Sequence, residues 1–196
     1  MTSITDKLEQ FNAFYLIAHP LKVNIQSATQ MQAEQSMDEF EQNMPYAFRI
    51  SSEMSEIEAK ALRPFRSMGE KFDELVDYLQ LQAKKMDLMM SYILLQQDEE
   101  AYRNTAIKFG GGGIVIGSDK SVTLGEHVIL KLFLETESAA IYCMAQVVAC
   151  EQSANNTEPS FEVSYAYTHI REQDQELLVR ASLHLQTAQL RKNQSN

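Results

Sequence analysis

The chain has 196 residues, of which 44% are hydrophobic, so it can bury a core and is not a disordered protein. Its 17 basic and 27 acidic side chains give a net charge of −10. This balance argues against binding to nucleic acid polymers or anionic membranes, because both require clustered Lys and Arg. The N-terminus lacks the pattern of a secretory signal, and no apolar run approaches the ~20 residues of a spanning helix. We therefore expect a cytoplasmic protein without membrane insertion.

Residues 1–50 predict a helical N-terminal region with one strand. Apolar residues recur at helical spacing up to about residue 18. Pro20 then ends the expected helix, because it forces His19 out of helical geometry. Residues 21–26 alternate apolar and polar side chains, as in a half-buried strand. The Gln-rich, acidic segment 28–43 is typical of a solvated helix that ends before Pro45.

Residues 51–100 form the second expected segment, a long helix that is interrupted or restarted at Pro64 and carries heptads. Counted from Gly69, the a positions are Gly69, Val76, Ala83 and Met90. The d positions are Phe72, Leu79, Met86 and Ile93. A second stripe on the opposite side of the helix, at c and f positions, consists of Tyr78, Leu81, Lys85, Leu88, Tyr92 and Leu95.

A helix that is apolar on two sides needs two partners. We expect one face to cover the chain's own domain and the other to meet a second chain. The alternative is an internal helix that is packed on both sides within a monomer. Uninterrupted heptads favour self-association through a coiled-coil-like helix. The residues that we expect to carry this assembly are Phe72, Val76, Leu79, Met86, Met90 and Ile93.

Residues 101–191 form the third segment, in which the apolar pattern changes to that of short strands. The expected strands are 105–109, 113–116, 128–134, 141–148 and 161–167. Their short spacing and alternation predict a small antiparallel barrel or sheet. A helix at about 172–191 closes the chain, so the expected fold class is α+β.

Four glycines form one run, Gly110 to Gly113, between two of these strands. The backbone N–H groups of such a run can cradle a phosphate. A P-loop, however, continues into Lys-Ser/Thr and a helix, whereas this run continues into Ile114 and a strand. The run therefore predicts a tight connection between strands, with positive-φ residues or a bulge.

Four stretches of the chain resemble the PilZ domain family: AIKFGGGGIVIGSD, VTLGEHVILKLFL, AQVVACE and FEVSYAYTHIREQDQELLVRASLHLQ. The resemblance covers residues 103–190, and the long helix is similar to that of the PilZ subgroup that inserts a heptad-bearing helix and forms tetramers. It implies a six-stranded β-barrel followed by a helix, a homotetramer, and in many members binding of cyclic di-GMP.

The cyclic di-GMP motif of the family is degenerate in this chain. The family uses RxxxR, which does not occur here, and the polar residues of DxSxxG. Lys108 and Gly110 stand at the Asp/Asn and Ser positions, and Gly113 alone matches. Each lost charge-assisted contact is worth roughly 1.5–3 kcal/mol. We therefore expect a signalling adaptor for motility or surface attachment, with an unknown protein partner and no cofactor. The alternative is an atypical cyclic di-GMP receptor that uses Arg103, Lys108, Gly110 and Gly113.

Patterns of catalysis are missing from the sequence. The four histidines are scattered, and Cys143 and Cys150 have neither metal-ligand spacing nor a base partner in sequence, so we expect no enzyme and no metal site. The acidic groups at 98–100 and 172–176 are typical of helix termini and solvated faces. A hypothesis of a different class is a helical-bundle chaperone or secretion accessory with an accidental likeness to the barrel.

Overall fold

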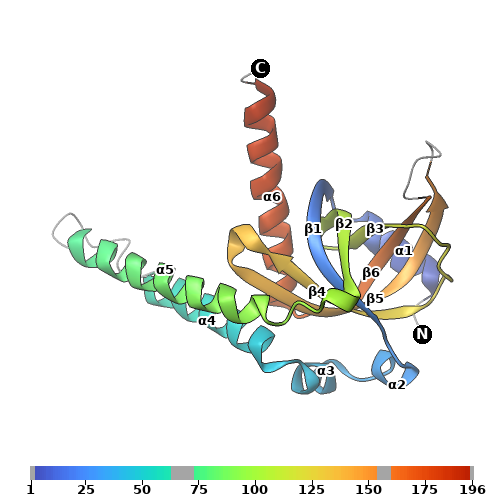
Figure 1. Ribbon diagram of the computed structural model, residues 1–196, viewed down its shortest axis with the longest axis horizontal. Helices are drawn as coiled ribbons and strands as arrows, with labels where there is room; N and C mark the ends of the chain where they lie inside the picture. Colours follow the sequence, from blue (N-terminus) through green and yellow to red (C-terminus); the bar gives the residue numbers. More distant parts are fainter. Residues whose placement is uncertain (1–2, 63–72, 154–159, 195–196) are drawn as a thin grey trace.

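The computed structural model describes residues 3–62, 73–153 and 160–194. At its centre is a closed antiparallel barrel with the strand order β1-β2-β3-β6-β5-β4 (Figure 1). The strands are β1 (Leu16–Ser27), β2 (Arg103–Gly110), β3 (Gly113–Ser118), β4 (His127–Leu134), β5 (Ala139–Gln152) and β6 (Phe161–His169). All five strands predicted after residue 100, and the strand at 21–26, lie within these elements.

The helices surround the barrel on several sides. They are α1 (Ile4–Asn12), α2 (Gln30–Ala33), α3 (Met37–Asn43), α4 (Tyr46–Leu62), α5 (Asp73–Leu95) and α6 (Glu172–Gln194), with short 3-10 turns η3 (Glu100–Tyr102) and η4 (Glu135–Glu137). Helices α4 and α5 run side by side as an arm away from the barrel, and α6 projects in another direction (Figure 1). The α+β fold class with a barrel, a long helix and a C-terminal helix is confirmed.

The main core fills the barrel interior. It contains fully buried side chains from every strand, including Ile17, Phe109, Leu130, Ile141 and Val163. Helix α6 adds Leu178 and Ala181 to the same core, so its first half is packed against the barrel. The second half of α6 extends beyond the strands, where most of its side chains are exposed.

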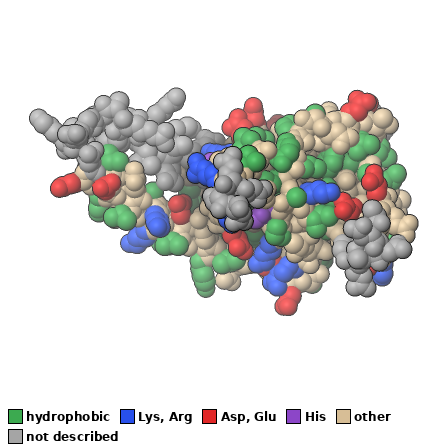
Figure 2. Space-filling model, turned by 90° about the horizontal axis from the view of Figure 1, so that it is seen from above, with side chains coloured by type: hydrophobic (Ala, Val, Ile, Leu, Met, Phe, Trp, Pro, Cys, Tyr) green, Lys and Arg blue, Asp and Glu red, His purple; other side chains and the backbone are tan. Residues whose placement is uncertain are grey.

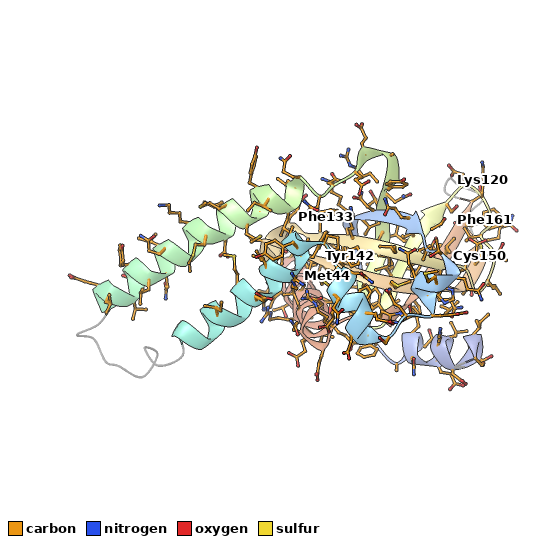
Figure 3. The ribbon with its side chains drawn as sticks, turned by 90° about the horizontal axis from the view of Figure 1, so that it is seen from below. Met44, Lys120, Phe133, Tyr142, Cys150 and Phe161 are labelled. Atoms are coloured by element: carbon orange, nitrogen blue, oxygen red, sulfur yellow. The ribbon has the colours of Figure 1, made fainter. Side chains whose placement is uncertain are left out.

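A second core joins the helical arm to the outer surface of β4 and β5. Its helical members are Phe40, Met44, Phe48, Met90 and Leu94, and its strand members are Ile129, Phe133, Ala140 and Met144. Met44, Phe133 and Tyr142 lie together in this region, at the end of the barrel that faces the arm (Figure 3). This apolar contact fixes where the base of the arm meets the barrel.

Two predictions about the N-terminal region are wrong. The first helix ends at Asn12, and Pro20 lies inside β1, where the pairing with β2 shifts between Ala18 and Leu21. An irregularity of this kind accommodates proline, which lacks an N–H for the ladder. The segment 28–43 holds two short helices instead of one. The second begins at a capping box formed by Ser36 and Glu39. It buries Phe40, which is only 1% exposed.

Candidate functional site

The glycine run forms the predicted connection between β2 and β3, but its backbone is covered by other parts of the chain. A Cβ atom on Gly110 would lie 2.2 Å from the carbonyl oxygen of Tyr15, and one on Gly113 would lie 2.0 Å from that of Tyr165. Gly111 and Gly112 face Phe14 and the end of α1 in the same way. None of the four has a positive φ, so of the two expected alternatives the positive-φ turn does not occur; the pairing of β2 with β3 instead shifts register between Ala106 and Lys108. At Gly110, Gly112 and Gly113 neighbouring backbone leaves no room for a side chain, whereas at Gly111 the nearest atoms belong to the side chains of Val179 and Phe14.

The two basic residues proposed for ligand binding are not brought together with each other. Lys108 Nζ lies 3.0 Å from the Glu162 carboxylate on β6, and both side chains are partly exposed. Arg103 stands at the opposite end of β2, roughly 16 Å away at ~3.3 Å per strand residue. Its guanidinium lies 2.8 Å from Asp98. Both cations are therefore paired with carboxylates of the same chain.

Asp98 is the centre of a polar cluster at the end of α5, which consists of Lys22, Asn24, Asp98 and Arg103. The Asp98 carboxylate lies 2.8 Å from Lys22 Nζ and accepts a 2.9 Å hydrogen bond from the Asn24 amide. Asp98 keeps 5% of its side chain exposed and Asn24 keeps 1%. The reading of Asp98 as part of a solvated face is therefore wrong, because the strand β1 covers it with matched polar partners.

A second set of contacts lies beside this Asp98 cluster. The backbone N–H of Glu99 donates to Asn24 Oδ1 at 2.8 Å, and the Glu99 carboxylate pairs with Lys131 of β4. Lys131 Nζ also donates to the carbonyl oxygen of Gln97 at 3.2 Å. Three successive residues after α5 are thus bonded to β1 and β4. Lys131 is the one charge in the apolar run 128–134, and this is the sequence signal that would have indicated the contact.

The charges of the cluster act on Asp98. Burial favours the neutral carboxyl and would raise its pKa. Hydrogen bonds from Arg103, Lys22 and Asn24 outweigh burial and hold the pKa of Asp98 well below its ordinary range. The carboxylate is therefore charged at neutral pH, and it anchors the base of the arm to the barrel.

Helix α5 has one covered side. Ala83 and Met90 are each 7% exposed and Leu94 is 3% exposed, whereas Val76 and Leu79 are half-buried. This side faces α4 and the second core, so the expected a positions lie mainly within the chain. A straight helix drifts about 20° per heptad, which carries the expected d positions Met86 and Ile93 out of that contact. Their exposures are 49% and 44%, and Gly69 and Phe72 lie outside the described residues.

Most of the large apolar side chains on the remaining surface of α5 are exposed, and the exposed charges Glu74, Asp77, Lys84 and Lys85 lie among and beside them. We call these exposed apolar side chains the α5 outer face, which consists of Leu75, Tyr78, Leu81, Met86, Leu88, Met89, Tyr92, Ile93 and Leu95. Exposure reaches 66% at Leu81 and Tyr92 and 65% at Leu88. Hydrophobic side chains are visible along this arm in Figure 2. Single exposed apolar residues are ordinary, but a contiguous set of this length marks an interaction surface.

Metal-ligand clusters and reactive thiols were the two kinds of chemical site that the sequence left to be compared with the structure. No three His, Cys, Asp or Glu side chains there are placed to hold a metal ion. Cys143 and Cys150 are free thiols, and burial raises the pKa of Cys143 well above its ordinary value, which makes it a poor nucleophile. Within the same residues, no helix is both long and apolar enough to cross a bilayer.

Solved structures of other proteins are similar to this one. A tetrameric PilZ protein of Xanthomonas campestris, described as self-assembled via an unusual helical bundle, superposes with a TM-score of 0.55 at 12% identity, over 93% of this chain and 96% of that one. The Bacillus subtilis inhibitor of motility superposes with a TM-score of 0.46 at 13% identity over 89% of this chain, which spans 51% of that protein. No curated protein sequence matches the chain.

The family itself is shown by the sequence. The model of the PilZ domain matches residues 82–184, which is more than half of the chain and includes the end of α5, β2 to β6 and the first half of α6. The closed six-stranded barrel followed by a helix is the architecture that the resemblance implied. The chain therefore belongs to the PilZ domain family.

Proposed function

We propose that this PilZ protein is a non-enzymatic adaptor that self-associates through the α5 outer face. The observation that carries the proposal is the row of exposed apolar side chains along α5, while the opposite side of the same helix is already buried within the chain. Leaving such a face in water is costly, since burial of apolar area yields about 25 cal/mol per Å². A second copy supplies a face of matching length and chemistry.

Assembly through helices fits the shape of the arm. The arm is an α4–α5 pair that extends away from the barrel, which leaves its outer surface accessible to other arms (Figure 1). The Xanthomonas campestris protein, which shares the fold, is described as a tetramer built through a helical bundle. This supports a homotetramer as the proposed state of this chain.

The same surfaces favour an adaptor over a receptor for cyclic di-GMP. The glycine run is packed against Phe14 and α1, and Lys108 is paired with Glu162. An anion at this position would have to displace an existing carboxylate and an aromatic ring. We propose that the barrel works through a protein partner, in a pathway of motility or surface attachment.

Self-association is tested by the double variant Leu81→Glu/Leu88→Glu, measured by light scattering over a range of concentrations. Both residues are about two-thirds exposed in the single chain, so the variant should fold and lose the oligomer, because the assembly would bury like charges. Met31→Glu is the matched control, since Met31 is 84% exposed on α2, away from α5. An unchanged mass of the double variant would refute the proposed assembly.

The absence of a nucleotide role is tested by calorimetric titration with cyclic di-GMP. We expect no heat and no shift of the melting temperature, since a ligand that binds only the folded state would raise it. Binding at micromolar concentration that disappears in Lys108→Ala or Arg103→Ala would instead establish the atypical receptor.

A further inference from the structure

A second exposed surface lies on α6, which projects from the barrel in another direction than the α4–α5 arm (Figure 1). Residues four apart on a helix share a ridge, and one ridge of α6 consists of Glu172, Glu176, Arg180 and His184. All four are exposed; the first two are acidic, the third is basic and the fourth is a histidine. The ridge borders a hollow of about 460 Å³ that also contains Phe14, Val179 and Leu183.

The charges of this ridge are not used within the described residues. Neither Glu172, Glu176 nor Arg180 makes an ion pair there, and His184 contacts Glu137 at 3.2 Å. Glu176 and Arg180 are correctly spaced for a pair along the helix, yet they do not form one. Beside them, Leu183 is 52% exposed and Phe14 is 38% exposed. The ridge therefore combines unpaired charges with an apolar floor.

The charge order is self-complementary. When two identical helices lie antiparallel, residue 176 of one meets residue 180 of the other if their centres coincide at residue 178. Glu176 of each copy then faces Arg180 of the other. A twofold symmetric contact uses the same patch on both copies, so each favourable pair occurs twice.

We propose that Glu172, Glu176, Arg180 and Leu183 of α6, together with the neighbouring Phe14, form a second self-contact, which binds α6 of another copy in antiparallel orientation. Glu176 pairs with Arg180 of the second copy, and Leu183 and Phe14 cover each other's apolar surface. The contact does not involve α5, so it can be tested independently of the assembly through the arm. Together, the two contacts would link α5 assemblies to one another.

The contact is tested in the Leu81→Glu/Leu88→Glu background, in which association through α5 is removed. Sedimentation equilibrium over a concentration series should show a monomer–dimer equilibrium. Arg180→Glu places like charges opposite each other twice, so we expect the dissociation constant to rise about tenfold. The exchange Glu176→Arg/Arg180→Glu restores opposite charges across the twofold axis and should restore the dimer.

The matched control is Lys192→Glu, which makes the same charge change on the exposed end of α6 outside the proposed register. It should leave the dissociation constant within about twofold of its background, because surface charges outside a contact contribute little. A background that is monomeric at every concentration would refute the contact. So would an Arg180→Glu variant that dimerises unchanged, or an exchange variant that stays as weak as Arg180→Glu. Failure of the α5 assembly would appear separately, in the mass of the Leu81→Glu/Leu88→Glu variant against the wild type.

Discussion

Lys22 Nζ lies 2.8 Å from the Asp98 carboxylate, and this ion pair joins the first strand of the barrel to the residues that follow α5. The two partners are 76 positions apart in the sequence, with the entire helical arm between them. The Lys22 side chain is 29% exposed and that of Asp98 is 5% exposed. The base of the arm is therefore attached to the barrel by an ion pair that is largely shielded from water. The direction in which the arm presents its outer face depends on this contact and on the second core.

We expect Asp98→Ala to lower the free energy of unfolding by roughly 1–3 kcal/mol, because the buried Asn24 amide loses an acceptor. Lys22 and Arg103 are partly exposed and add little. The matched control is Glu100→Ala, which changes an exposed carboxylate two positions away. Urea denaturation at neutral pH measures both. Equal stability of the two variants would contradict the role of Asp98 as an anchor.

The same carboxylate predicts a dependence on pH. Because the pKa of Asp98 is lowered from 3.8 on folding, the unfolded chain binds its proton more readily. The stabilisation is fully present above that ordinary value and is lost as the pH falls from it towards the lower pKa of the folded chain. The difference in stability between wild type and Asp98→Asn should therefore shrink between neutral pH and about pH 3. A difference that stays constant over this range would contradict the charged interaction.

Two adjacent methionines distinguish the sides of α5. Met90 is 7% exposed in the second core, and Met89 is 61% exposed on the α5 outer face. In the Leu81→Glu/Leu88→Glu background, Met90→Ala should lower the free energy of unfolding by about 2–5 kcal/mol, because it leaves a cavity. Met89→Ala should change it by less than about 0.5 kcal/mol. Similar losses for both variants, in a thermal or urea titration, would show that α5 packs in another orientation.

Alanine substitutions in the glycine run test how tightly the connection between β2 and β3 is packed. We expect Gly113→Ala to destabilise the chain by about 3 kcal/mol or more, since its Cβ would meet the Tyr165 carbonyl oxygen at 2.0 Å. Gly111→Ala should cost less, because the atoms nearest to its Cβ belong to the side chains of Val179 and Phe14, which can shift. Circular dichroism melts give the comparison. A smaller cost at Gly113 than at Gly111 would refute the packing of this turn.

The sequence predicted the barrel well because its strands are local patterns. Runs such as 128–134 and 161–167 show their length and alternation within a few residues, and each lies inside the observed strand. The glycine run was correctly placed in a turn. Its need for glycine could not be predicted, because the carbonyl oxygens that exclude a side chain belong to Tyr15 and Tyr165, which are remote in sequence.

The candidate surfaces were predicted less completely for the same reason. Heptad counting found that α5 is apolar on two sides, but the choice of inner side depends on Phe40 and Phe48, which belong to the second core. Phe40 lies in a segment that reads as solvated. Asp98 likewise resembles an ordinary helix terminus until Lys22 and Asn24 are placed over it by the barrel. Contacts between residues that are remote in the sequence determine both the inner side of α5 and the environment of Asp98. Composition and periodicity do not predict such contacts.

Tyr167 provides a test inside the barrel core. Its hydroxyl is buried and has no hydrogen-bond partner among the described residues, and burial raises its pKa well above the ordinary value. An unpaired buried polar group costs free energy, so Tyr167→Phe should raise the free energy of unfolding by up to about 1 kcal/mol.

The control for Tyr167 is the variant Tyr167→Leu, which removes the ring as well as the hydroxyl. It should lower the free energy of unfolding by about 2 kcal/mol or more, because the ring packs against the barrel core. Urea denaturation of the three proteins separates the contributions of the ring and the hydroxyl. If Tyr167→Phe were less stable than the wild type by more than about 1 kcal/mol, the hydroxyl would have a bonded partner in solution, such as a buried water. The barrel interior would then be polar at this point, and Tyr167 would be retained for that bond rather than for its ring.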